Sequence, residues 1–226
     1  MQDHPVSRFP VPSVDELPDD IRLRIVSVQE KLGFIPNVFL TLAHRPDEFR
    51  AFFAYFDALM MPKASGLTKT EREMIVVATT AINHCVYCVA HHGAILRLRA
   101  KNAQIADSVA LNYRWADLSP RELAMLDFAV NVATTSHAQC NEDFEALDEH
   151  GFSDEDTWDI GAITAFFCSW QPDGQLNRHA PQCRVLRARP QPVRTTSLGS
   201  GLIDQSQKIT VAARAIAEKK TVGHRS

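Results

Sequence analysis

Twenty consecutive residues, Glu73–His92, read E-M-I-V-V-A-T-T-A-I-N-H-C-V-Y-C-V-A-H-H. The interior of the first part is apolar all round, which predicts a helix buried on most of its sides. In the second part, Cys88 follows Cys85 by three residues and His92 follows Cys88 by four. Helical side chains at these spacings share one face, so two thiols and an imidazole are expected side by side. We expect the rest of the chain to be the scaffold of that face.

Helical patterns extend on both sides of this stretch. Two segments, Thr68-Lys-Thr-Glu71 and Ser119-Pro-Arg-Glu122, have the spacing of a capping box and should each start a helix. Pro46 should split the second predicted helix. No alternating strand pattern, hairpin dipeptide or internal repeat occurs, so the fold class we predict is all-α. The helices are expected at about residues 14–32, 37–61, 68–82, 85–99, 119–136, 141–150 and 153–167.

Composition narrows the class of protein. The chain has 226 residues, of which 45% are hydrophobic, so one domain with a sizeable core, with or without a tail, is expected. A net charge of −3 gives no electrostatic reason to expect a nucleic acid or an anionic membrane as partner. The opening residues are polar and proline-broken, unlike a signal peptide, and no apolar run is long enough for a membrane span. Five cysteines, an odd number, do not suit a disulfide-stapled secreted domain, and we expect a cytoplasmic protein.

The central stretch can support thiol chemistry. A thiol reacts as its thiolate, which is favoured by a helix N-terminus, a histidine or a second thiol. His92, one turn after Cys88, can carry a proton. Glu73 could join it if the helices before and after the expected break at Asn83-His84 pack antiparallel. A carboxylate, a histidine, an attacking thiol and a second thiol that resolves the sulfenic acid would then form one site, with no cofactor.

Another interpretation of the cysteine pair is a zinc site. Its ligands would be Cys85 and Cys88 with one or two of His84, His91 and His92. Four ligands on one short helix cannot surround a tetrahedral ion, so a distant ligand would be required. A thioredoxin-like pair is disfavoured because no strand precedes the motif. We interpret His91 as a solvated surface residue.

The spacing Glu73-x11-Cys85-x2-Cys88-x3-His92 resembles the alkyl hydroperoxidase D-like branch of the carboxymuconolactone decarboxylase family. The similarity is closest to its peroxidase-related subgroup and covers about residues 35–167. Further matching segments are I-P-N-V at 35–38, A-H-R-P at 43–46, L-T-K-T-E-R-E at 67–73 and L-S-P-R-E at 118–122.

The resemblance implies an all-helical bundle that forms homo-oligomers and reduces hydroperoxides with electrons from a dithiol reductant. It makes Cys88 the attacking thiol, Cys85 the resolving thiol, and Glu73 with His92 the proton relay. The decarboxylase branch lacks the cysteine pair, so its chemistry is not expected. Some members relay protons through a histidine between the cysteines, where this chain has Tyr87. A non-enzymatic redox or zinc-binding module is the alternative.

The domain organisation that we predict has three parts. Residues 1–34 form an N-terminal arm and first helix, 35–167 the alkyl hydroperoxidase D-like domain, and 168–226 a largely disordered tail. Permitted codons for the tail, read one base later, spell A-L-G-N-R-M-A-N-L-T-A-M-R-P-N-A-E-F-Y-A-L-G-R, which resembles the ending of family members. We therefore predict a frameshift near Phe167, and an inactive copy impaired by its altered C-terminus is a further alternative.

Overall fold

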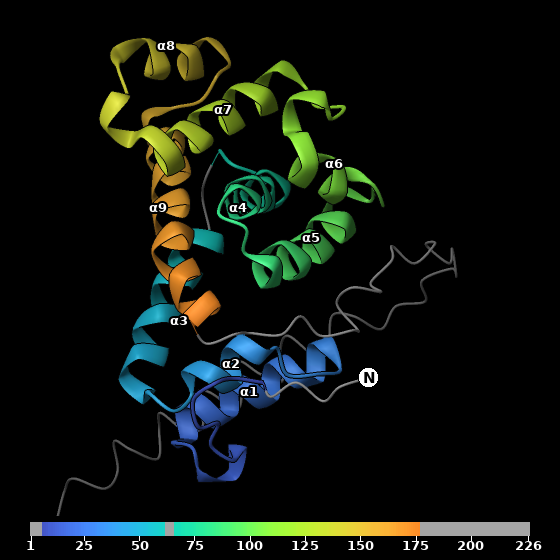
Figure 1. The fold of residues 1–226 in the computed structure, drawn as a ribbon, viewed down its shortest axis with the longest axis vertical. Coiled ribbons are helices and arrows are strands. Elements are labelled where there is room, and N and C mark those ends of the chain that lie inside the picture. The colour runs from blue at the N-terminus through green and yellow to red at the C-terminus, as the bar shows by residue number, and fades with distance from the viewer. Residues whose placement is uncertain (1–5, 62–65, 177–226) are drawn as a thin grey trace, which may run out of the picture. The chain divides into compact units, whose positions relative to one another are not determined.

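A computed structural model describes residues 6–61 and 66–176, drawn in colour in Figure 1. Every regular element within these residues is helical, which confirms the all-α prediction. The α-helices are α1 (Asp19–Leu32), α2 (Asn37–Leu42), α3 (Pro46–Met60), α4 (Lys69–Ile82), α5 (Val86–Ala100), α6 (Ile105–Asn112), α7 (Pro120–Thr135), α8 (Asn141–Glu149) and α9 (Asp154–Leu176). Short 3-10 turns are η1 (Val14–Glu16), η2 (Tyr113–Trp115) and η3 (Ser136–Ala138).

Helix α4 is the centre of the core. It begins with the predicted capping box, in which Thr68 and Glu71 each accept a hydrogen bond from the other's backbone N–H. All residues from 71 to 80 are buried, because α5, α6, α7 and α9 pack around the helix (Figure 1). Arg72, 1% exposed, forms an ion pair with Asp159 at 2.5 Å and so ties α4 to α9. The helix that carries Glu73 is therefore held from several sides.

The N-terminal helices form an aromatic-rich layer. Arg24 of α1 makes two hydrogen bonds of 2.8 Å to the Asp57 carboxylate of α3, and its guanidinium lies over the Phe53 ring. Phe53 in turn stacks on Phe39 of α2, with ring centroids 4.2 Å apart. Phe52 packs edge-on against Trp170 of α9. Through these contacts, aromatic rings of α2, α3 and α9 pack together and face residues of α4 and α5.

The predicted first helix is divided by Pro18. We expected one helix over residues 14–32, whereas η1 ends at Glu16 and α1 begins after Pro18. Leu17 is extended, with φ −76° and ψ 152°, because a proline ring disfavours helical geometry in the residue before it. Pro46, by contrast, divides α2 from α3 as predicted and stands at the start of α3.

Two other features differ from the sequence prediction. Helix α6 was not predicted; it has no side-chain cap at its start, and three buried apolar residues hold it against its neighbours. Helix α9 continues to Leu176, so the predicted end of this helix at about Phe167 is wrong. The reason is tertiary, since Trp170 packs on the Phe52 and Phe166 rings. Most of the predicted tail and frameshift concerns residues 177–226, which lie outside the described residues. The tail and the frameshift therefore stay predictions.

No helix within the described parts of the chain combines the length and the apolar character that a membrane crossing requires.

Candidate active site

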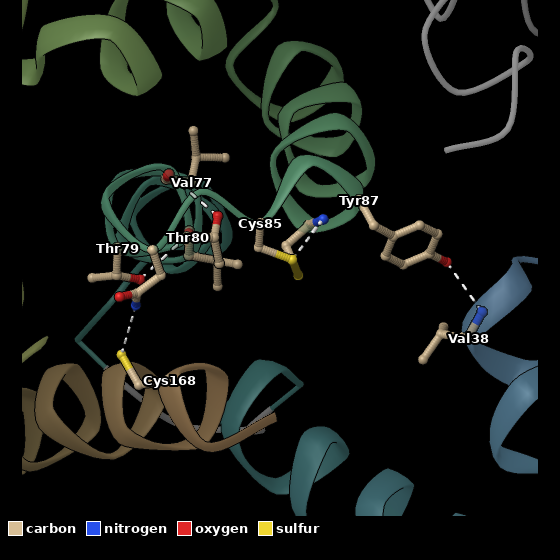
Figure 2. The surroundings of a disulfide bond; sticks show 10 residues. Val38, Val77, Thr79, Thr80, Cys85, Tyr87 and Cys168 are labelled. Atoms are coloured by element: carbon tan, nitrogen blue, oxygen red, sulfur yellow. Dashed lines mark hydrogen bonds between the residues drawn. A yellow bond between two sulfur atoms is a disulfide. The ribbon is translucent and has the colours of Figure 1, made fainter. Parts of the chain in front are cut away.

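The cysteine pair lies at a tight turn between α4 and α5. His84 adopts a left-handed conformation (φ 56°), which is uncommon for a residue other than glycine. Cys85 closes the turn by donating its backbone N–H to the carbonyl of Thr80 at 3.0 Å. It is also the N-cap of α5, where its sulfur accepts the N–H of Cys88 at 3.4 Å (Figure 2). The pair therefore occupies a helix N-terminus, a position that favours a thiolate.

Cys85 and Cys88 are joined by a disulfide bond (Figure 2). Their Cα atoms are 5.4 Å apart, a separation typical of disulfides. The two sulfurs differ in access, because Cys85 is 1% exposed whereas Cys88 is half-buried. Cys88 is thus the more accessible thiol of the pair after reduction.

Glu73 reaches the α5 site across the interface between α4 and α5. Its Oε2 lies 2.7 Å from Nδ1 of His92, and its Oε1 forms an ion pair of 3.0 Å with Arg99. The carboxylate and the imidazole are both buried, at 2% and 7% exposure. This contact brings Glu73 and His92 together. We expected it from the sequence on the condition that the helices before and after Asn83-His84 pack against each other. The carboxylate fixes the orientation of the His92 ring, and the Arg99 cation stabilises the carboxylate charge.

Tyr87 and His91 also face this site from α5. The Tyr87 hydroxyl accepts the backbone N–H of Val38 at 3.2 Å and so joins α5 to α2 (Figure 2). Burial raises the pKa of Tyr87 to about 12, which keeps the phenol neutral. Burial, with a smaller contribution from His92, lowers the pKa of His91 to about 3, so this imidazole is neutral as well. The interpretation of His91 as a solvated surface residue is wrong, because the ring is half-buried and turned inward.

These side chains open onto a cavity of about 430 Å³. Cys88, His91, His92, Glu73 and Tyr87 line one side of it, while Cys85 does not line it. Its other walls are mainly apolar and come from α1, α2, α3 and α9. A volume of this order is within the ~300–1,000 Å³ range of pockets that enclose small organic ligands. The apolar residues that line it are Val28, Leu32, Pro36, Val38, Phe39, Leu42, Phe52, Phe53, Phe56, Met60, Met61, Ile95, Phe167 and Trp170.

The zinc alternative does not fit this arrangement. His84 is exposed and lies at the turn, whereas His92 is bound to Glu73. Among residues 6–61 and 66–176, no three histidine, cysteine, aspartate or glutamate side chains are grouped so that they could hold a metal ion. The distant ligand that the sequence argument required is therefore not found in the part of the chain that the structure describes.

Comparison with known proteins shows which family and which folds this chain is similar to. The profile of the carboxymuconolactone decarboxylase family matches residues 46–131. A crystal structure described as an alkylhydroperoxidase AhpD core, an uncharacterized peroxidase-related protein from Ralstonia eutropha JMP134, is 61% identical in sequence. The match covers 81% of this chain and 96% of that one, with a TM-score of 0.79.

Two further structures share the fold. An uncharacterized peroxidase-related protein from Silicibacter sp. TM1040 is 35% identical, with 83% of this chain and 97% of that chain covered and a TM-score of 0.78. The debrominase Bmp8 is 22% identical over 80% of this chain and 93% of its own, with a TM-score of 0.66, which indicates a common fold and no more. No curated protein matches the sequence.

Proposed function

The chain belongs to the alkyl hydroperoxidase D-like branch of the carboxymuconolactone decarboxylase family, and from that premise we propose that it is a thiol-dependent peroxidase. The observation that carries the proposal is the position of Cys88. This thiol lines an apolar cavity at a helix N-terminus, with its partner Cys85 behind it and a carboxylate-held histidine one turn along the helix. The proposed nucleophile Cys88, resolving thiol Cys85 and proton carrier His92 thus all lie at the start or in the first two turns of α5.

In the first step of the proposed cycle, the Cys88 thiol passes its proton towards His92 and attacks one oxygen of the hydroperoxide. The O–O bond breaks, its electron pair leaves with the other oxygen, and that oxygen takes up the proton to give an alcohol. Cys88 becomes a sulfenic acid. The Glu73 carboxylate, which contacts the imidazole at 2.7 Å, orients the ring and offers a negative charge beside the proton that it takes up.

In the second step, the Cys85 thiol attacks the sulfur of the sulfenic acid and water leaves. The product is the Cys85–Cys88 disulfide, the form in which the two cysteines stand in this structure. A dithiol reductant then supplies two electrons and two protons by thiol–disulfide exchange, which restores both thiols. The half-buried Cys88 sulfur is the one that such a reductant can reach.

The cavity favours an organic hydroperoxide over hydrogen peroxide. Phe56, Phe167 and Trp170 are among the aromatic residues that line it, and contact with an apolar body stabilises a complex by about 25 cal/mol per Å² of apolar surface removed from water. Hydrogen peroxide offers no such surface. The proposed substrate is therefore a hydroperoxide that carries an apolar group.

We further propose that the chain assembles with copies of itself. Leu111 at the end of α6 and Trp115 in η2 are 87% and 88% exposed. Exposed apolar side chains on adjoining elements, as α6 and η2 are, mark a protein contact surface where they form a contiguous patch. Light scattering coupled to gel filtration should give a mass that is a multiple of 25.3 kDa, and a single-chain mass would contradict this.

The test of the proposed function is hydroperoxide consumption. The reduced protein is mixed with cumene hydroperoxide and dithiothreitol, and the remaining hydroperoxide is followed with time. We expect catalytic turnover that Cys88→Ser abolishes and that Cys140→Ser, at an exposed free cysteine, retains. Equal turnover by the wild-type protein and Cys88→Ser would reject the proposal.

A further inference from the structure

His91 is a polar group of the cavity that the proposed cycle leaves without a role. It lines the cavity together with Cys88, and at three residues' separation the two side chains lie on one face of α5 with Cβ atoms about 5–6 Å apart. Its ring is parallel to the Tyr87 ring, with centroids 5.9 Å apart and an interplanar angle of 3°. It meets the His92 ring edge-on at 5.3 Å. Two aromatic neighbours thus fix its orientation beside the thiol.

The ring nitrogens of His91 are available to a ligand. His92, His44 and His150 each use a ring nitrogen in a hydrogen bond within the protein, whereas His91 makes ring contacts but no hydrogen bond with the described residues. Within the described residues, the side-chain nitrogens that are fully buried and lack a hydrogen-bond partner are those of Arg24 and Gln139. The nitrogens of His91 lack a partner in this part of the chain too, but they are not among these buried atoms. The His91 nitrogens are therefore not sealed off, and they can be reached from the cavity.

The charge state of His91 suits a hydroperoxide. Its low pKa, caused by burial and by His92, keeps the imidazole neutral at any pH near 7. A neutral imidazole presents one N–H donor and one nitrogen acceptor. The –OOH group presents one O–H donor and oxygen acceptors, so the two are complementary. His92 differs from His91 in that its Nδ1 contacts the Glu73 carboxylate, so the two neighbouring imidazoles are suited to separate tasks.

We propose that His91 binds the –OOH group of the substrate beside Cys88, an inference that rests on the proposed peroxidase function. Cys88 attacks the near oxygen while the His91 N–H donates a hydrogen bond to the oxygen that leaves. The negative charge that develops on this oxygen is stabilised by the bond, and the proton that completes the alcohol comes from the Cys88 thiol by way of His92. His91 itself keeps its proton throughout, so atoms and electrons balance as in the cycle above.

The test compares two substitutions at this position. His91→Phe keeps an aromatic ring against Tyr87 and removes both nitrogens, whereas His91→Gln restores a donor and an acceptor. A donor aimed at developing charge is worth about 10²–10³ in rate, so we expect His91→Phe to lower kcat/KM for cumene hydroperoxide by about 100-fold. His91→Gln should recover at least about a tenth of the wild-type value. His137→Phe, the same change at an exposed histidine outside the cavity, is the matched control and should leave kcat/KM unchanged.

A second readout separates substrate binding from activation of the thiol. Iodoacetamide alkylates the Cys88 thiolate without an –OOH group, so its rate with His91→Phe should equal that of the wild-type protein, and the pH dependence of alkylation should be the same. A kcat/KM for His91→Phe within threefold of wild type would overturn the inference. So would a loss of alkylation rate as large as the loss of peroxidase rate. Absence of turnover in the wild-type protein would instead overturn the proposed function itself.

Discussion

The two sides of the cavity are built in different ways. On one side, Glu73, Cys88 and His92 come from the two consecutive helices α4 and α5, and Glu73 contacts His92 at 2.7 Å and Arg99 at 3.0 Å. On the other side, aromatic rings are brought together from α2, α3 and α9, and α9 is distant in sequence from the other two helices. The first side holds the groups to which the proposed cycle assigns the transfer of electrons and protons, and the second offers mainly apolar surface. We infer that the chemistry depends on the polar side and the choice of substrate on the aromatic side.

The largest effect expected from the polar side is that of Glu73→Gln. The amide keeps the shape of the side chain but carries no negative charge to stabilise a protonated His92. Proton transfer from Cys88 to His92 should therefore be slower. General acid–base groups contribute about 10²–10⁴ in rate, and we expect a fall of about 100-fold in kcat/KM for cumene hydroperoxide and for hydrogen peroxide alike. Steady-state kinetics of both substrates measure it. Glu142→Gln, at an exposed position on α8, is the control, and a fall below threefold in Glu73→Gln would remove Glu73 from the relay.

A second effect from the polar side concerns stability at acid pH. The pKa of His91 is about 3 in the folded protein and about 6.5 when unfolded. Between these values the unfolded chain binds the extra proton, so the free energy of unfolding falls as the pH falls, by about 1.4 kcal/mol per pH unit. The slope is half as steep at pH 6.5, where the unfolded chain is half protonated, so from pH 6.5 to pH 5 the wild-type protein should lose about 1.6 kcal/mol more than His91→Phe.

Urea denaturation at the two pH values measures this difference. His137→Phe, at an exposed histidine, should lose as much stability as the wild-type protein because it keeps His91. Equal losses in the wild-type protein and His91→Phe would mean that His91 is not held neutral by burial.

The aromatic side should affect one substrate and not the other. Phe56 is half-buried, lines the cavity and has its ring centroid 6.2 Å from that of Phe53. Phe56→Ala removes apolar contact worth about 1.5 kcal/mol to an apolar substrate, so kcat/KM for cumene hydroperoxide should fall about 10-fold. The value for hydrogen peroxide should stay the same. An equal loss for both substrates would contradict the division of tasks between the two sides.

The smallest expected effect is on stability, from loss of the hydrogen bond that joins the polar side of the cavity to the aromatic side. The Tyr87 hydroxyl on α5 accepts the N–H of Val38 on α2 at 3.2 Å. Tyr87→Phe leaves this N–H without its partner while the ring remains, which should lower the free energy of unfolding by about 1 kcal/mol. Urea denaturation at pH 7 measures it. No loss of stability would show that the bond adds nothing to the contact between α5 and α2.

The same comparison explains what could be read from the sequence. Cys85, Cys88 and His92 lie at the start and in the first turns of α5, so their spacing was enough to predict that they lie close together. Glu73 lies on the helix before, and the sequence placed it beside His92 only on the condition that the two helices pack antiparallel. The start of α4 was predicted because a capping box is a local signal at Thr68. Such features depend on residues close to one another in the chain.

The aromatic side gave no comparable signal. Nothing in the spacing around Phe52 or Trp170 shows that these rings meet, because their helices are far apart in the chain. His91 was misread for the same reason. Its spacing from Cys88 placed it on the same face of α5, but only packing against the rest of the cavity decides that this part of the face is buried. Helix α9 continues beyond Phe167 through Trp170, another contact that local sequence does not reveal.

The central claim is that Cys88 is the thiol that hydroperoxide oxidises and Cys85 the thiol that resolves it. Reduced Cys85→Ser protein, which cannot close the disulfide, is treated with one equivalent of cumene hydroperoxide in the presence of dimedone, and the labelled peptide is identified by mass spectrometry. We predict a dimedone adduct on Cys88 and none on the exposed Cys140. An unlabelled Cys88 after consumption of the hydroperoxide would contradict the account.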